Sequence, residues 1–389
     1  MEMSLDLWLE YVLRFSHLVA GISWIGSSFY FIWLDSSFLP PETPLHNVEG
    51  EVFMVHGGYY YQVKKRKFSP TGIPKTLHWF KWEATLTFIT GLSLFVYLYY
   101  LKGARLLINP NVFNLSQTQA ISLSLFMMIA SWFIYDFIWS AKIFRAQLVR
   151  VLVTLCYFCA AIYLATQFFS GRGAYMVIGA IFGTAMLLNV WVRILPGQAK
   201  MLNKAKEGLD PDHLVGKRSK LRSVHNTYFI FPVLFIMLSN HYPVVYNHQY
   251  NWLLLIVLAF SGAFARHGLV TQRARERWVF LPAGIGFMAL VFMTAQAPSS
   301  QKIIQGRVDY LKIKPIIQAR CLRCHSTKNS DETFDEAPNG ILFETESQIL
   351  DYREKIIEQV IVAKTMPLNN VTNITEEERG IIKKYFSDR

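Results

Sequence analysis

Three residues in the C-terminal quarter of the chain have the types and the spacing of a covalent haem site. Cys321, Cys324 and His325 form a Cys-x-x-Cys-His motif in the stretch ARCLRCHS. In such a motif the two thiols form thioethers to the haem, and the histidine supplies an iron ligand. A zinc site would need two further ligands, but residues 298–389 contain no other cysteine or histidine. The motif therefore predicts one covalent haem c.

A single methionine, Met366, follows the motif within residues 298–389. A thioether opposite the histidine completes His/Met ligation, which raises the reduction potential and suits an electron acceptor. We therefore expect His325 and Met366 to be the two metal ligands. The stretches around both ligands have helical spacing, and TEEERGIIKKYFSDR begins with a threonine N-cap. Residues 298–389 thus predict a small all-α cytochrome c domain.

The rest of the chain is apolar enough to lie in a lipid bilayer. Of all residues 52% are hydrophobic and 17% are charged, whereas a soluble domain carries about 25% charged residues. We predict an all-α fold in which an integral membrane domain (1–297) of about eight helices precedes the cytochrome domain (298–389), with a short linker at 295–301. The predicted membrane helices are 11–34, 79–101, 118–139, 151–170, 175–195, 225–246, 252–270 and 278–297.

The distribution of basic residues predicts how these helices are oriented. The net charge is +12, and the whole excess lies in residues 1–297. The connections after the first, third, fifth and seventh helices carry 18 Lys and Arg, and those after the second, fourth and sixth carry three. Because basic connections stay in the cytoplasm, we expect the N-terminus and the cytochrome domain outside it. Because the surplus of basic residues is confined to these connections, it indicates the orientation of the helices in the membrane and not a phosphate-binding surface. We therefore expect no nucleic-acid partner.

Polar side chains near the cytoplasmic ends of the predicted helices mark a candidate cavity. Arg266 and Lys81 have the charge to hold an anion, and a loop at 56–67, HGGYYYQVKKRK, has glycines that would let its backbone approach a ligand. The candidate substrate-binding residues are Arg266, Lys81, Trp82, Ser27 and Ser28. The candidate catalytic residues, which would move protons, are Glu83, His78, Asp136 and His267.

Several of these side chains have an equally good structural interpretation. Lys81 can extend its ammonium group to the membrane surface, and Asp136 can pair with Lys142 or Arg145. His17 lies alone and deep in the first helix. It is a hydrogen-bonded helix contact, a proton-transfer group, or an axial ligand of a second, non-covalent haem. The candidate partners for that haem are His241 and His248.

Four stretches of the chain resemble the membrane-bound, cytochrome c-containing urate oxidases of bacteria. They are ISWIGSSFYFIWLD, LHWFKWEATLTFITG, SNHYP (239–243) and AKTMPLNNVT (363–372). The resemblance covers essentially the whole chain. HGGYYYQVKK looks like a version of the HGG-aromatic loop of the family, and ARHGLV departs from the usual ending of its seventh helix. It implies a protein of the bacterial inner membrane that oxidises urate to 5-hydroxyisourate with oxygen from water. Electrons would pass to its own haem c, then to a soluble cytochrome c or a terminal oxidase.

The chemistry implied by this resemblance suits the candidate residues. Urate is a flat monoanion near neutral pH, which favours Arg or Lys for its charge and Trp for stacking. If urate binds at the cytoplasmic cluster, the haem lies across a core of about 30 Å. Either the pocket then lies deeper, towards His17 and Trp24, or another carrier lies between. Two alternatives remain: a quinol or other donor, or a non-catalytic membrane-anchored electron-relay subunit.

Overall fold

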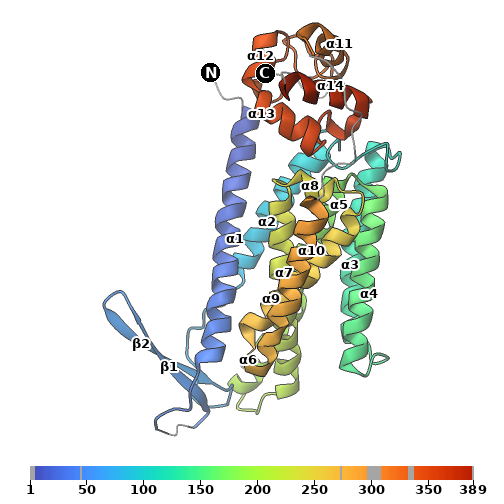
Figure 1. Ribbon diagram of the computed structural model, residues 1–389. Helices are drawn as coiled ribbons and strands as arrows, with labels where there is room; N and C mark the ends of the chain where they lie inside the picture. Colours follow the sequence, from blue (N-terminus) through green and yellow to red (C-terminus); the bar gives the residue numbers. More distant parts are fainter. Residues whose placement is uncertain (1–4, 44–45, 272–273, 296–307, 332–336, 388–389) are drawn as a thin grey trace.

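The computed structural model of the chain is mostly helical, with long helices in a bundle and short C-terminal helices gathered at one end of it (Figure 1). It describes residues 5–43, 46–271, 274–295, 308–331 and 337–387. The predicted domain boundary after residue 297 and all but the first residue of the predicted linker lie outside the described residues. We refer to the end of the bundle away from the C-terminal helices as the far end.

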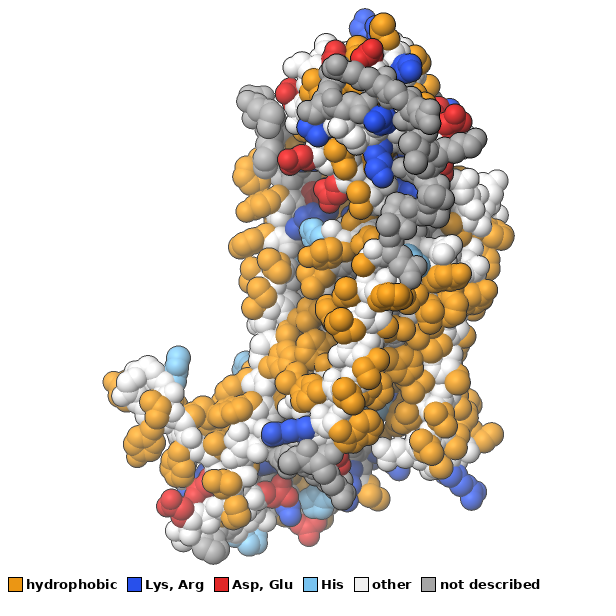
Figure 2. All heavy atoms as spheres, viewed as in Figure 1, with side chains coloured by type: hydrophobic (Ala, Val, Ile, Leu, Met, Phe, Trp, Pro, Cys, Tyr) orange, Lys and Arg blue, Asp and Glu red, His pale blue; other side chains and the backbone are white. Residues whose placement is uncertain are grey.

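The long helices overlap the predicted membrane segments. By length and composition, the described part of the chain has eight helical stretches apolar enough to cross a membrane, and apolar side chains cover much of the bundle surface (Figure 2). These features are compatible with a membrane protein. The bundle helices are α1 (Leu5–Ser37), α2 (Trp82–Val96), α3 (Gln117–Ser140), α4 (Gln147–Phe168), α5 (Gly171–Leu188), α6 (Leu195–Lys206), α7 (His213–Ser239), α8 (Pro243–Tyr246), α9 (Asn251–Val270) and α10 (Phe280–Ala295).

Two helical stretches differ most in extent from their predicted segments. A π-helical turn, Asn189–Ile194, joins α5 to α6, so the helical stretch there continues to Lys206 rather than ending at 195. Helix α7 begins at His213, where the Asp212 side chain accepts a hydrogen bond from the Leu214 N–H as an N-cap. It ends at Ser239 rather than at 246. The residues added to these two helical stretches, 196–206 and 213–224, include many polar ones, which hydropathy alone places outside a helix.

Glycines allow the central helices to approach closely. A Cβ on Gly179 of α5 would lie 2.8 Å from Ile236 of α7, and a Cβ on Gly262 of α9 would lie 2.9 Å from Phe231 of α7. Small residues at such crossings are typical of helices that pack within a bilayer. Helix α1 is different, because Leu34 is its one buried residue among those described. The bundle core therefore lies among α2 to α9, and α1 packs on its side.

A β-hairpin departs from the predicted all-α class. Strands β1 (Val48–His56) and β2 (Tyr59–Arg66) pair antiparallel and project from the far end (Figure 1). Gly57 and Gly58 form its two-residue turn with φ of +61° and +82°, as such tight turns require. A Cβ on either glycine would meet nothing within 4 Å. The positive φ of this turn is therefore a sufficient structural reason for the glycines of the HGG stretch.

The C-terminal helices surround a small apolar core of their own. They are α11 (Tyr310–Arg320), α12 (Glu346–Asp351), α13 (Arg353–Ile356), continued by a π-helical turn to Val362, and α14 (Glu376–Ser387). Ile313, Ile349 and Tyr385 are fully buried in this core. Thr345 and Gln348 form a capping box that starts α12. The predicted small helical unit around the Cys-x-x-Cys-His motif therefore has a packed interior separate from the bundle core.

Candidate functional sites

A cavity of about 680 Å³ lies against the Cys-x-x-Cys-His motif. Both thiols, His325 and Met366 line it together. Volumes of this order are typical of sites that enclose a small molecule or cofactor. The structure therefore brings all four sequence-predicted haem residues to one cavity, although Met366 follows the motif by some forty residues.

The histidine side of the cavity is positioned by the end of α11. The N–H groups of Cys324 and His325 donate to the carbonyl of Cys321, so the motif forms a tight turn after the helix. His325 Nδ1 lies 3.0 Å from the carbonyl oxygen of Ile341. A carbonyl only accepts, so Nδ1 carries the proton and Nε2 keeps its lone pair. This is the tautomer that an Nε2 metal ligand needs, and burial lowers the pKa of His325, which favours the neutral ring.

The two cysteines are half-buried. Burial raises the pKa of Cys321 to about 12, and burial also raises the pKa of Cys324. Both are free and stay protonated near neutral pH. Within the described residues, no group of three or more His, Cys, Asp or Glu gathers as a metal site would require. The donor set of this cavity therefore fits a covalently attached haem better than a zinc ion.

The methionine side of the cavity is shaped by residues 363–369, which we call the methionine loop. Lys364 and Asn369 adopt positive φ, of +50° and +51°, a conformation that asparagine tolerates better than most residues. Arg379 of α14, whose side chain is only 4% exposed, donates from Nη1 to the carbonyl of Met366 at 2.9 Å and to the carbonyl of Val360. Sequence reasoning missed Arg379; the only signal was its place among the apolar positions of the last helix.

A loop of the bundle closes the remaining side of the cavity. Gly103, Arg105, Ile108 and Pro110, from the connection between α2 and α3, line it. The Arg105 guanidinium pairs with Asp331, which also lies 3.3 Å from Arg323 of the motif. Sequence reasoning did not anticipate this wall, because nothing in the local sequence of 102–115 indicates a contact more than two hundred residues away.

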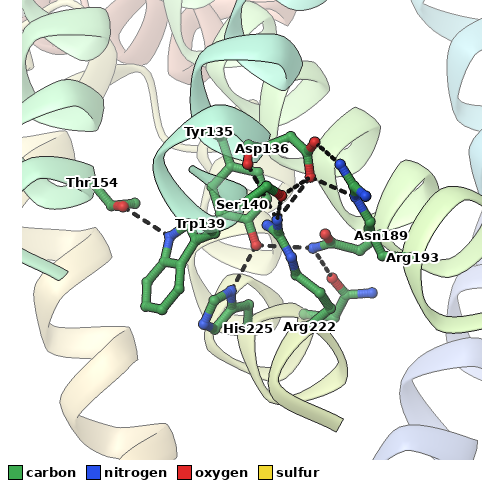
Figure 3. Close-up of polar contacts among 10 residues, drawn as sticks. Tyr135, Asp136, Trp139, Ser140, Thr154, Asn189, Arg193, Arg222 and His225 are labelled. Atoms are coloured by element: carbon green, nitrogen blue, oxygen red, sulfur yellow. Dashed lines mark hydrogen bonds and ion pairs between the residues drawn. The ribbon is translucent and has the colours of Figure 1, made fainter. Parts of the chain in front are cut away.

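Asp136, a predicted catalytic residue, is engaged in a double ion pair (Figure 3). Its carboxylate contacts Arg193, with 2.9 Å from Nε to Oδ1, and Arg222, with 2.7 Å from Nη2 to Oδ1. The predicted alternative was a pair with Lys142 or Arg145, and the partners are instead two arginines from the π-helical turn and α7. Both carboxylate oxygens already accept from guanidinium groups, Oδ1 from both arginines and Oδ2 from Arg193. This geometry favours a structural role.

The same network continues into the bundle core (Figure 3). The Tyr135 hydroxyl lies 2.7 Å from His225 Nδ1 and accepts from Asn189 Nδ2 at 3.1 Å. Asn189 also donates to Asn226 at 2.8 Å. Helices α3 and α7 and the π-helical turn after α5 are thereby joined by hydrogen bonds within the hydrophobic bundle. Within this network, Asp136 is the residue named above as a candidate catalytic residue.

Glu83, Lys81, Trp82 and His78 gather around the start of α2. The Lys81 ammonium lies 5.4 Å from the ring centres of both Trp82 and Trp191, which is a cation–π arrangement. Glu83 Oε2 is buried and has no hydrogen-bond partner among the described residues. His78 is exposed, with its ring against Phe80. Of the predicted proton-transfer residues, Glu83 alone therefore combines burial with an unused acceptor atom.

Arg266 and His267 lie on α9 next to Tyr228 of α7. The Arg266 guanidinium lies 4.2 Å from the centre of the Tyr228 ring, and the Tyr228 hydroxyl lies 2.6 Å from His267 Nδ1. Arg266 is 6% exposed, and its Nε has no partner within the described part of the chain. His267 Nε2 also lies 3.7 Å from Glu276. An almost fully buried guanidinium with an unused donor is suited to an anion.

The remaining predicted residues lie on α1. The Ser27 hydroxyl donates to the carbonyl of Trp24 within the helix, and Ser28 is half-buried. His17 Nδ1 lies 3.1 Å from the carbonyl of Thr87 and 3.2 Å from the Thr90 hydroxyl, both on α2. A Cβ on Gly91 would lie 2.7 Å from the imidazole. These contacts agree with a hydrogen-bonded helix contact, and none of the contacts of His17 involves His241 or His248.

The predicted bundle residues thus fall into separate groups. Among the described residues, no hydrogen bond or ion pair joins Glu83, Asp136 and Arg266 to one another. The four predicted haem residues, in contrast, line one cavity.

Comparison with known protein families gives one match. Residues 3–296 match the family model described as urate oxidase N-terminal. No curated protein and no solved structure matches the chain.

Proposed function

Because the chain belongs to the urate oxidase N-terminal family, we propose that it is a membrane-spanning oxidoreductase that oxidises urate and passes the electrons to its own haem c. Urate and water would give 5-hydroxyisourate, two electrons and two protons. The observation that carries the electron-transfer part is the single cavity lined by both thiols, His325 and Met366. Cys321 and Cys324 would anchor the group, and His325 and Met366 would ligate its iron. When bound, the haem supplies a one-electron acceptor.

The oxidation of urate would take place within the bundle. In this proposal Arg266 binds the urate anion, because its buried Nε has no hydrogen-bond partner among the described residues. Glu83 would be the base that takes a proton from the attacking water, because its buried Oε2 has no hydrogen-bond partner among the described residues. Lys81 and Trp82 offer a cation and a flat ring at the start of α2, although Trp82 is 56% exposed. In this proposal Asp136 organises the helices and takes no proton.

The remaining parts of the proposal concern the setting of the reaction. The helical domain 1–297 would span the inner membrane of a bacterium, and the cytochrome domain 298–389 would lie outside the cytoplasm. One haem takes one electron, so each urate would require two successive transfers. A soluble cytochrome c or a terminal oxidase would receive each electron.

The deciding experiment mixes urate anaerobically with purified full-length protein whose haem is oxidised. We expect the spectrum of reduced haem c to appear, with two electrons recovered per urate consumed once an external acceptor is added. Reduction by a quinol but not by urate would contradict the proposed substrate. Reduction only with a partner protein would indicate an electron-relay subunit. A pyridine haemochrome assay would count covalent and non-covalent haem, and a non-covalent haem would give His17 a different role.

The bundle residues are tested by two variants in the same assay. Glu83→Gln keeps the shape of the side chain but removes the base, so the rate of haem reduction by urate should fall about a hundredfold or more. Arg266→Gln should raise the urate concentration for half-maximal rate. Glu207→Gln, the same substitution at an exposed residue after α6, serves as the matched control. Equal rates for Glu83→Gln and Glu207→Gln would remove Glu83 from the reaction.

A further inference from the structure

The bundle holds both ends of the methionine loop. At one end, Asn369 Nδ2 donates to the carbonyls of Arg105 and Ile108, both at 2.7 Å. At the other end, Asn247, which follows α8, donates from Nδ2 to the carbonyl of Ala363 at 3.1 Å. Met366 lies midway between these two contacts. Within the C-terminal domain, Arg379 donates a hydrogen bond to the carbonyl of Met366.

Arg105 connects this contact to the opposite side of the cavity. Its carbonyl accepts from Asn369, and its guanidinium pairs with Asp331, which is 2% exposed. Asp331 also meets Arg323, which lies between the two cysteines of the motif. The 102–108 loop is therefore attached to both the methionine side and the histidine side of the cavity that it helps to line.

The chemistry of the Asn369 contact makes it specific. Both acceptors are main-chain carbonyls, so only a donor side chain of this length satisfies them. Asn369 also holds a φ of +51°, and asparagine, aspartate and glycine accept this conformation most readily. Asn369 thus bends the methionine loop through its backbone and attaches the loop to the bundle through its side chain.

We propose that Asn369 is a positioning residue through which the bundle holds Met366 in place as the distal ligand. This inference rests on the proposed haem c, and it adds that His/Met ligation depends on contact with the bundle. The haem then has its high reduction potential when the C-terminal domain is in contact with the helical bundle, in which the proposed function places urate oxidation. Release of the contact withdraws the thioether and lowers the potential.

The test compares Asn369→Asp with Asn373→Asp in the full-length protein. Asn369→Asp preserves shape and backbone conformation but places a carboxylate, which cannot donate, against two carbonyls. Asn373 has a φ of +55° in the following turn and is exposed, and no described contact joins its side chain to the bundle. Asn369→Gly removes the amide while tolerating positive φ, and serves if the carboxylate prevents folding. Each variant is compared at equal covalent haem content.

Three readouts report on the ligand directly: the Met–iron absorption band of the oxidised haem, the reduction potential, and carbon monoxide binding to the reduced haem. For Asn369→Asp we expect the ratio of protein with Met366 on the iron to protein without it to fall about tenfold. The variant loses the two hydrogen bonds that attach the methionine loop to the bundle. The potential should fall and carbon monoxide binding should rise. Asn247→Ala combined with Asn369→Asp should enlarge all three changes, and Asn373→Asp should match wild type.

An unchanged band and potential in both Asn369→Asp and Asn369→Gly would overturn the inference while leaving haem c and urate oxidation intact. A wild-type protein with haem but no Met–iron band would overturn it as well. A wild-type protein without covalent haem would instead overturn the proposed function. These outcomes are distinguishable in one set of spectra.

Discussion

At the scale of single residues, the structure separates side chains that the sequence presents as equivalent. Asp136 and Glu83 are both carboxylates inside apolar helices. Asp136 is bound by two arginines, whereas Glu83 has a buried oxygen without a partner among the described residues. The oxygens of Asp136 are already occupied as acceptors, whereas the unpartnered oxygen of Glu83 keeps its acceptor capacity. The two therefore suit opposite roles.

The assignment of Met366 gives a prediction at this scale. Met366→Ala leaves the thioether anchors Cys321 and Cys324 in place, so covalent haem should be retained. The Met–iron band should disappear and the reduction potential should fall, because the soft sulfur ligand that favours the reduced iron is gone. Absorption spectroscopy with a potentiometric titration measures both. Met293→Ala, at a methionine of α10, is the control, and an unchanged band in Met366→Ala would assign the distal ligand elsewhere.

At the scale of the elements, ion pairs and caps explain why helices begin and meet where they do. The carboxylate of Asp136 joins α3 to α7 and to the turn between α5 and α6. In α14, Glu378 and Thr375 form a reciprocal cap, with 2.8 Å from Thr375 N to Glu378 Oε2 and 3.1 Å from Glu378 N to Thr375 Oγ1. Glu378 also contacts Arg320 of α11 at 3.0 Å, so the same side chain links the last helix to the helix that carries the motif.

The Asp136 network predicts a loss of stability rather than of chemistry. Asp136→Asn leaves the Arg222 guanidinium, whose side chain is 6% exposed, without its counter-ion. Removing one partner of a buried ion pair costs about 3–5 kcal/mol. The thermal midpoint in detergent should fall by several degrees, while folded protein should keep its rate of haem reduction by urate. Lys142→Gln serves as the control, and a stable Asp136→Asn protein without urate oxidation would instead make Asp136 catalytic.

Glu378 predicts how the stability of the C-terminal domain depends on pH. Burial raises the pKa of Glu378, but hydrogen bonds from the Thr375 N–H and from Arg320 outweigh burial and lower it overall. A carboxyl with a lower pKa when folded stabilises the fold above its unfolded pKa of about 4.3. That stability is lost as the pH falls through the lower, folded value.

The corresponding measurement is thermal unfolding of wild type and Glu378→Gln, followed by haem absorption between neutral and acidic pH. At neutral pH the variant should be less stable by about 1 kcal/mol, a typical value for a lost cap. The difference should vanish in acid, where the wild-type side chain is also protonated. Glu377→Gln, at the exposed neighbour, should show no such convergence. A constant difference at every pH would mean that the charge of Glu378 contributes nothing.

At the scale of the whole molecule, the structure has two distinct ends. The C-terminal helices cover one end of the bundle, and the β-hairpin and α6 lie at the far end (Figure 1). The hairpin strand β2 carries Lys64 and Lys65, and α6 carries further basic residues. The connections richest in Lys and Arg therefore gather away from the cavity that contains Cys321 and His325.

This arrangement predicts opposite accessibility of the two ends. An epitope inserted between Gly57 and Gly58 should be protected from protease in intact spheroplasts, and an epitope after Arg389 should be cleaved. The physical reason is that basic connections stay on the cytoplasmic side of the membrane. Both epitopes should be cleaved after the membrane is permeabilised. Cleavage of the inserted epitope in intact cells would reverse the proposed orientation.

The sequence by itself determined the features that depend on local composition and spacing. It indicated the helical stretches, since about 20 apolar residues suffice to define each one. It also gave the prediction of the haem residues, because Cys321, Cys324 and His325 are neighbours and Met366 is the one methionine within residues 298–389. The hairpin at 48–66 was missed as an element, although the Gly57–Gly58 turn between aromatic residues carried the signal for it.

Only the tertiary structure decided which distant residues meet. It paired Asp136 with Arg193 and Arg222, set His17 against Thr87 and Gly91, and placed Asn369 on the carbonyls of the 102–108 loop. Each of these contacts joins groups far apart in the chain, and hydrogen bonds and ion pairs act only over a few ångströms. Their partners are therefore fixed by how the helices pack and not by local sequence.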